Sequence, residues 1–172
     1  MRRIAVLGCG GAGKTTLANA LGVRLGIDVT HGDILGRVGD ARAQGEEWRR
    51  LEAGVIAREA WILDAMRLGS LYKRLERADT AIFLDLPRRT CLLSVARRRL
   101  RPRGAVDEQT GVADRFNLAF LRWIWRFRSI ERPQILAGLD AHRATTDVVV
   151  LRSRRQVRRF LGRAGGFDAM NA

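Results

Sequence analysis

Short apolar runs alternate along this chain with longer stretches in which apolar residues recur every three or four positions. The short runs predict β-strands, because turn-forming or charged residues end each of them. The expected strands are 3–7, 27–30, 60–63, 80–86 and 147–151. The run 80–86 is the clearest buried strand, since apolar residues fill most of it before Pro87.

The longer stretches predict amphipathic helices. In 14–25, for example, Leu17, Leu21 and Leu25 fall on one stripe. Asp114 and Ser153 are candidate N-caps of the last two helices. The expected helices are 14–25, 46–58, 68–78, 90–100, 114–131 and 154–163. Strands that alternate with helices in this way are typical of an α/β protein with a parallel sheet.

The length and composition indicate one globular domain. The chain has 172 residues, of which 47% are apolar. We expect a single domain over 1–164 and a disordered tail at 165–172. No apolar run approaches the roughly 20 residues that cross a bilayer, and the apolar segment that follows Met1 is too short for a signal peptide. A cytoplasmic monomer or homodimer with no membrane partner is therefore expected.

The net charge and the cysteines exclude fewer classes of function than the length and composition do. The formal net charge of +14 fits a nucleic acid, an acidic membrane surface or a polyanionic small substrate. A GC-rich genome encodes arginine in place of lysine, but this alone does not explain the excess of basic over acidic residues, so nucleic-acid binding stays open. Cys9 and Cys91 are isolated in the sequence, and the two cysteines and two histidines show no metal-ligand spacing.

The segment between the first strand and the first helix carries the strongest motif. Residues 8–15 read G-C-G-G-A-G-K-T, which is the pattern G-x-x-x-x-G-K-[ST] of a phosphate-binding P-loop, or Walker A motif. Backbone N–H groups and the positive end of the following helix would cradle a triphosphate. Lys14, one of only two lysines beside 30 arginines, is expected to reach the β- and γ-phosphates, and Thr15 to ligate Mg²⁺. The residues expected to bind ATP are Gly8, Cys9, Gly10, Gly11, Ala12, Gly13, Lys14, Thr15 and Thr16.

The same glycines also satisfy G-x-G-x-x-G, the dinucleotide fingerprint, with Gly8, Gly10 and Gly13. Lys14 and Thr15 place a cation and a hydroxyl where a dinucleotide-binding helix needs neither. The chain is also short for a dinucleotide domain joined to a substrate domain. The P-loop is therefore the preferred interpretation.

Three acidic residues, Asp33, Asp64 and Asp85, follow three of the predicted strands. Ligands of open α/β sheets bind outside the carboxyl ends of the strands, so all three can face a bound nucleotide. We expect Asp64 to hold Mg²⁺ through water and Asp33 to orient the phosphoryl acceptor. The alternative for each is a turn or cap residue.

An arginine cluster follows the strand 80–86. It comprises Arg97, Arg98, Arg99, Arg101 and Arg103. Guanidinium groups bind phosphate oxygens in pairs, and a segment that closes over a site excludes water. We expect an arginine-rich lid near 97–113, with Arg97, Arg98 and Arg101 as catalytic candidates. The alternative is a solvated basic surface.

Four segments together resemble adenylate-kinase-related P-loop proteins, and most closely the bacterial DNA topology modulation proteins. The segments are 8–16, 31–35, 81–87 and the tryptophan-rich 120–128. The resemblance implies a P-loop nucleoside or nucleotide kinase fold, with a five-stranded parallel sheet in the order 2-3-1-4-5 and helices on both faces. It also implies ATP and Mg²⁺ as cofactors, and transfer of phosphate to a nucleotide, nucleoside or small metabolite. An ATP-dependent nucleic-acid-binding regulator with little kinase activity is the alternative.

The departures from this family concern the phosphoryl acceptor. Residues 64–67 read Asp-Ala-Met-Arg, where the family tends to have Asp-Gly-Asn-Tyr. Adenylate kinases have Gly-Asp-x-x-Arg after the second strand, whereas here Gly32 and Asp33 are followed by an arginine one position late, at Arg37. The identity of the acceptor therefore cannot be carried over.

Overall fold

The structure, a computed structural model, describes residues 1–35, 37–38, 41–42, 45–99 and 118–164. At its centre lies a five-stranded parallel sheet in the order β2-β5-β1-β6-β7. Numbered as the five strands of this sheet, the order is 2-3-1-4-5, so the predicted topology is confirmed. The strands are β1 (Arg3–Gly8), β2 (Val29–His31), β5 (Trp61–Asp64), β6 (Thr80–Leu84) and β7 (Asp147–Leu151).

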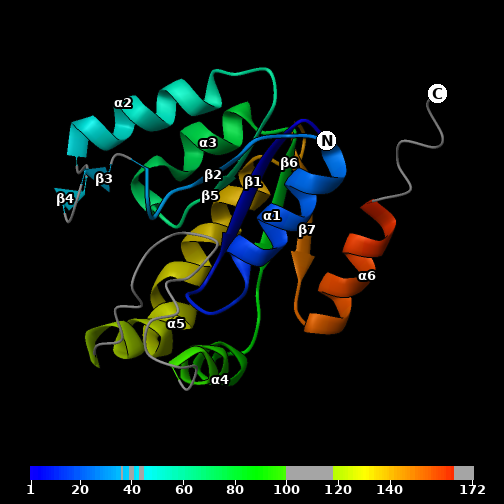
Figure 1. Cartoon of the computed structure of the whole chain (residues 1–172). Coiled ribbons are helices and arrows are strands. Elements are labelled where there is room, and N and C mark those ends of the chain that lie inside the picture. The colour runs from blue at the N-terminus through cyan, green and yellow to red at the C-terminus, as the bar shows by residue number, and fades with distance from the viewer. Residues whose placement is uncertain (36, 39–40, 43–44, 100–117, 165–172) are drawn as a thin grey trace.

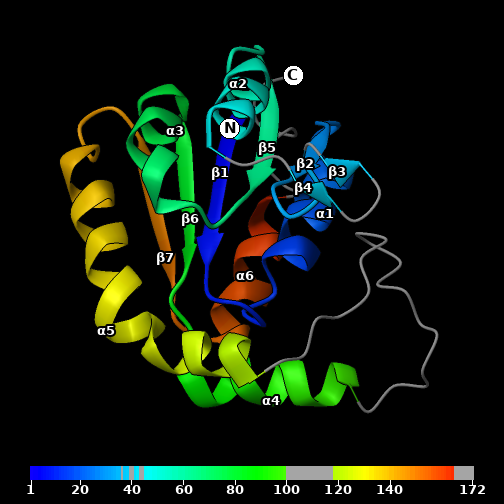
Figure 2. The same ribbon diagram turned by 90° about the vertical axis from the view of Figure 1, so that its left-hand side faces the viewer.

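Helices cover both faces of this sheet, as predicted. Helices α1 (Lys14–Leu25) and α6 (Arg154–Ala164) lie on one face (Figure 1). The other face carries α2 (Gly45–Ile56), α3 (Leu71–Arg77) with the short 3-10 helix η1 (Leu68–Ser70) before it, and α5 (Leu118–Ala141). Helix α4 (Arg88–Arg99) crosses the end of the sheet, below the loop that joins β1 to α1 (Figure 2).

The central strand β1 is buried from both sides. Ile4, Ala5 and Val6 have no exposed surface, because β5 and β6 flank the strand and helices pack on each face. A strand in this position needs apolar residues on both faces, which explains the continuous apolar run in the sequence. All five strands run parallel, and their carboxyl ends open toward the β1–α1 loop.

The long helix α5 departs from the prediction that it would end near Glu131. It continues through Pro133 to Ala141. Proline removes the N–H that would bond the carbonyl of Ser129, and both residues are exposed, so water can satisfy that carbonyl. Beyond the proline, Ile135 and Leu139 are buried in the core, and their packing stabilises the last turns.

Two short local features, a hairpin and a helix cap, also bear on the predictions. The hairpin of β3 (Arg37–Val38) and β4 (Ala41–Arg42) was not predicted, since its two-residue strands give no periodic signal. The predicted N-cap of α6 is confirmed: the Gln156 backbone N–H donates to Ser153 Oγ at 3.2 Å.

The remaining predictions of domain organisation are untested. No helix in the described ranges is both long and apolar enough to cross a membrane. Asp114, Arg101, the tail 165–172 and most of the expected lid lie outside the described residues. The assignment of one domain to 1–164 stays a prediction.

Candidate functional site

The β1–α1 loop has the geometry of an anion-binding loop. Gly13 is the N-cap of α1 with φ of 95°, a left-handed conformation that residues with a side chain rarely adopt. A Cβ atom at Gly13 would meet no protein atom within 4 Å, so this side of the loop is open. The first backbone N–H groups of α1, which belong to Lys14, Thr15 and Thr16, have no partner within the helix. The loop therefore presents donors and open space at the positive end of a helix.

The side chain of Lys14 folds over this loop. Its Nζ atom donates to the carbonyl oxygen of Cys9 at 3.4 Å. The ammonium group thus lies where a phosphate held by the loop would meet it. Thr16, the last residue of the expected binding set, is exposed on the first turn of α1.

Thr15 and Asp64, the two predicted metal ligands, lie together. The Thr15 hydroxyl donates to Asp64 Oδ2 at 2.8 Å, and His31 Nδ1 lies 3.4 Å from the same oxygen. Burial raises the pKa of Asp64, but the hydrogen bonds of His31 and Thr15 and the charge of Lys14 outweigh it, so the pKa lies below its usual value. Asp64 is therefore a buried carboxylate, ionised at neutral pH, beside a hydroxyl group.

These residues fit ATP and Mg²⁺. Carboxylate and hydroxyl oxygens are ligands that Mg²⁺ accepts, usually with water and phosphate oxygens completing its shell. Within the described ranges no group of three or more His, Cys, Asp or Glu side chains is placed to hold a metal ion. A Mg²⁺ ion bound mainly through phosphates needs no such group, so Thr15 and Asp64 suffice on the protein side.

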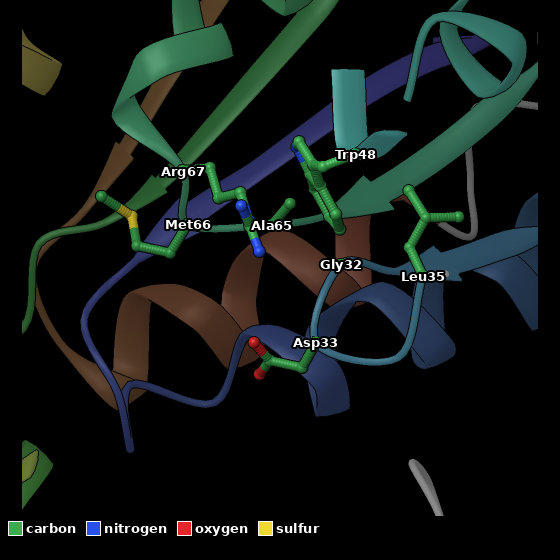
Figure 3. Close-up of a pocket in the computed structure, with 7 residues that line it drawn as sticks. All are labelled: Gly32, Asp33, Leu35, Trp48, Ala65, Met66 and Arg67. Atoms are coloured by element: carbon green, nitrogen blue, oxygen red, sulfur yellow. The ribbon is translucent and has the colours of Figure 1, made fainter. Parts of the chain in front are cut away.

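A pocket of about 230 Å³ opens next to this loop, between the ends of β2 and β5 (Figure 3). The backbone N–H of Gly32 donates to the Asp64 carbonyl at 2.7 Å, which ties the two strand ends together. A Cβ atom at Gly32 would lie 2.5 Å from that of Ala65, so only glycine fits this contact. Asp33 is exposed at the pocket, and its carboxylate extends into the space beside the β1–α1 loop (Figure 3).

Arg67 and Trp48 form another wall of the same pocket. The guanidinium carbon of Arg67 lies 4.2 Å from the centre of the Trp48 ring, a cation–π contact. Trp48 comes from α2 and is only 2% exposed. Sequence analysis did not assign either residue to the site, although the departure at residues 64–67 pointed to this loop.

The loop that carries Arg67 is held from behind by a buried ion pair. Arg74 is completely buried and donates through Nε to Glu52 Oε1 at 2.9 Å. Its Nη1 donates to the carbonyl of Ala65 at 2.7 Å, and its Nη2 to Ser70 Oγ at 3.2 Å. Helices α2 and α3 and the end of β5 are thereby fixed to one another.

Helix α4 packs directly against the P-loop. A Cβ atom at Gly11 would lie 2.5 Å from the Cys91 carbonyl and 2.8 Å from a methyl group of Val95. Cys9 and Cys91 are distant in the sequence but interact here, and this interaction together with burial raises the pKa of the Cys9 thiol. Both cysteines are buried and free.

The two described lid arginines, Arg97 and Arg98, are exposed near the end of α4. Cys91, Val95 and Arg98 are spaced by four and three residues, so Arg98 belongs to the helix face that contacts the P-loop. Arg97 is displaced from that face by about 100°. Among these two candidates, the geometry favours Arg98.

Asp85, the third acidic residue at a strand end, is already paired. Its carboxylate accepts two hydrogen bonds from Arg132, both of 2.8 Å, and Arg152 lies 3.8 Å away. It therefore connects α5 to the end of β6. This pairing with Arg132 is neither the nucleotide-facing role nor the turn or cap role that the sequence suggested for Asp85.

Solved structures with the same architecture are P-loop kinases. A shikimate kinase from Acinetobacter baumannii, in complex with shikimate, superimposes with a TM-score of 0.59, at 20% identity over 99% of this chain and 94% of that chain. An unliganded sugar kinase from a Janibacter species gives a TM-score of 0.59, at 18% identity over 99% and 96%. A gluconokinase from Sinorhizobium meliloti gives 0.51, at 16% identity over 99% and 98%.

At these identities the comparison shows the fold alone, and that fold is the P-loop kinase fold predicted from the sequence. No family model matches the sequence, and no curated protein matches it. The finer resemblance to DNA topology modulation proteins thus stays a prediction.

Proposed function

We propose that this protein is a cytoplasmic, ATP- and Mg²⁺-dependent phosphotransferase that moves the γ-phosphoryl group of ATP to a nucleotide, nucleoside or small metabolite. The observation that carries the proposal is the arrangement of the open P-loop, the Thr15–Asp64 hydrogen bond of 2.8 Å and a neighbouring pocket with an exposed carboxylate, Asp33. Kinases need these three parts close together: a triphosphate cradle, a metal-binding pair and a place for the acceptor.

Each residue contributes a distinct interaction. ATP with Mg²⁺, when bound, supplies the phosphoryl group and neutralises charge as the bond to phosphorus breaks. The N–H groups at the start of α1 and the ammonium group of Lys14 bind phosphate oxygens. Thr15 and Asp64 would hold the Mg²⁺ ion. Asp33 accepts a hydrogen bond from the acceptor hydroxyl and orients it. Arg98 adds positive charge above the phosphates in this proposal, and Arg97 and Arg101 are further candidates for the same role.

The two lysines of the chain provide a matched test of this proposal. Lys14 lies in the P-loop, and Lys73 is exposed on α3. Phosphate transfer from Mg-ATP to nucleotides, nucleosides and sugar acids is measured for the wild type, Lys14→Ala and Lys73→Ala. Loss of a charge that stabilises the transition state lowers turnover by about 10²–10³-fold. We expect this loss for Lys14→Ala and wild-type turnover for Lys73→Ala; equal turnover in all three proteins would refute the proposal.

A second candidate function, nucleic-acid binding in the manner suggested by the topology modulation resemblance, is favoured by α6. This helix contains no acidic residue, and its segment exposes Arg152, Arg154, Arg155, Arg158, Arg159 and Arg163. Contacts between such arginines and phosphates depend steeply on salt. If α6 binds DNA, replacing Arg155 and Arg159 by Gln lowers the slope of log K against log salt by up to about 2. An unchanged slope removes α6 from consideration.

A further inference from the structure

We infer that α4 and residues 118–130 of α5 form a surface, here called the α4–α5 surface, that binds single-stranded nucleic acid. A base stacks on Trp125, and the backbone phosphates contact the surrounding arginines. This surface is separate from the acceptor pocket and from α6, and the inference does not depend on the phosphotransferase activity. The supporting observations are the exposure of Trp125, its contact with Arg88, the charge of the two helices and the mixture of side chains on one helix face.

Trp125 is an aromatic side chain of α5 that core packing does not explain. Phe127 is 3% exposed and belongs to the core, and Trp123 packs against that core and donates through Nε1 to Glu131 Oε1 at 2.9 Å. Trp125, in contrast, is 55% exposed. Bases of single strands stack on aromatic side chains, because every base has a π-face. An exposed ring of this kind is suited to hold a base.

Arg88 fixes the position of this ring. Its guanidinium carbon lies 4.6 Å from the centre of the Trp125 ring, a cation–π contact. Arg88 begins α4, which packs against α5 at the end of the sheet (Figure 2). The contact orders the ring before a ligand arrives, which lowers the entropic cost of binding. Since more than half of Trp125 remains exposed, the guanidinium group leaves ring surface for a base.

The charge of the α4–α5 surface selects an anionic ligand. Helix α4 contains five arginines and residues 118–130 contain three, and neither segment contains an aspartate or a glutamate. Arg89, Arg122 and Arg126 are exposed. Guanidinium groups bind phosphate oxygens through paired N–H donors and also stack on aromatic faces. A second copy of this chain would bring the same charges and be repelled, whereas a polyanion is attracted.

The arrangement of the exposed side chains favours a single strand over a membrane. Arg122, Trp125 and Arg126 fall within an arc of about 100° on one side of α5. A helix that lies in a membrane interface separates its basic face from its apolar face, whereas here the ring and the two guanidinium groups share one face. A single strand presents bases and phosphates in alternation, so it meets both kinds of side chain at once.

Binding of matched oligonucleotides tests the inference. Fluorescence anisotropy compares oligothymidylate and oligouridylate of about 12 nucleotides, within the site sizes of roughly 4–16 nucleotides known for single-strand-binding domains, with an abasic strand of the same length and charge. The thymidylate, the uridylate or both should bind at least about fivefold more tightly than the abasic strand, which lacks the stacked base. The tighter of the two identifies DNA or RNA as the preferred source.

Variants then identify the group that holds the base. Trp125→Ala should weaken binding of the preferred strand by about 5–150-fold, the range for loss of one stacked base, and leave the abasic strand unchanged. Trp125→Phe keeps a ring and should retain most of the affinity. Tyr72→Ala is the control, because Tyr72 is 51% exposed but lies on α3. Replacing Arg122 and Arg126 together by Gln should lower the slope of log K against log salt by up to about 1.4.

Several outcomes would overturn the inference. They are equal affinity for the preferred and abasic strands, unchanged affinity in Trp125→Ala, and tighter binding to polyglutamate or to phosphatidylserine vesicles than to either strand. If Arg155 and Arg159 replaced by Gln abolish binding while Trp125→Ala keeps it, the strand binds α6 and the inference is wrong. If the strands bind as predicted but no phosphoryl transfer is found, the inference stands and the proposed phosphotransferase function fails.

Discussion

Replacing Arg74 by methionine would leave a buried carboxylate without its partner. Arg74 has no exposed surface and Glu52 is 2% exposed, and the two share hydrogen bonds that include one of 2.9 Å. Breaking such a pair from one side costs about 3–5 kcal/mol, because the remaining charge stays buried and uncompensated. The Ala65 carbonyl and the Ser70 hydroxyl also lose their donor. We expect a fall in unfolding free energy of at least this size, a large fraction of the roughly 5–15 kcal/mol typical of a domain.

Urea unfolding measures this effect, and a double variant tests its cause. Arg74→Met combined with Glu52→Leu removes both charges and should be more stable than Arg74→Met alone by about 2 kcal/mol or more. Arg77→Met is the control, since Arg77 is exposed on the same helix. The reasoning is refuted if the unfolding free energy of Arg74→Met lies within about 1 kcal/mol of the wild-type value. It is also refuted if the loss of unfolding free energy in the double variant equals the sum of the losses in the two single variants.

Three further predictions concern the lid, the loop and the acid stability. Arg98→Ala should lower turnover by about 10-fold or more through lost charge stabilisation, and Arg97→Ala, which alters the neighbouring helix face, should change it much less; steady-state kinetics that rank them in reverse would contradict the helical assignment. Gly13→Ala forces a residue with a Cβ to φ of 95°, which costs about 1–3 kcal/mol of unfolding free energy. Calorimetry should show a loss of ATP-binding free energy that exceeds this cost, since the methyl group enters the open side of the loop. Burial raises the pKa of Asp79, but hydrogen bonds from Thr80 and from two backbone N–H groups lower it by a larger amount, so the pKa lies below its usual value. Its stabilisation is therefore complete above the unfolded-state pKa of about 3.9 and is lost as the pH falls below it; urea unfolding should show Asp79→Asn less stable at neutral pH and nearly equal to the wild type at about pH 2, and an equal deficit at both pH values would contradict this.

The local parts of the site could be predicted from the sequence, because short patterns determine them. The loop residues 8–15 follow an apolar strand and open a helix, and this order alone placed Lys14 and Thr15. Asp64 is the last residue of strand β5, so its proximity to Thr15 was expected from the parallel sheet. The strand order, in contrast, came from the resemblance to known kinases, since periodicity does not specify which strands are neighbours.

Contacts between distant segments could not be predicted in the same way. Trp48 reads as one apolar residue of a helix, and only the packing of α2 brings it beneath Arg67. Arg74 looks like a surface arginine in its sequence context, yet its partner Glu52 lies 22 positions earlier. The helix was expected to end near Glu131, but exposure of the Ser129 carbonyl and burial of the residues after Pro133 allow α5 to continue.

The central proposal is that the β1–α1 loop binds a triphosphate and that Thr15 and Asp64 would hold the Mg²⁺ ion that accompanies it. Titration calorimetry of ATP into the wild type and into Thr15→Val, with and without Mg²⁺, tests it most directly. Binding heat that requires Mg²⁺ in the wild type and loses that dependence in Thr15→Val is the predicted result. A folded wild-type protein that shows no Mg²⁺-dependent heat with either ATP or GTP would contradict the account.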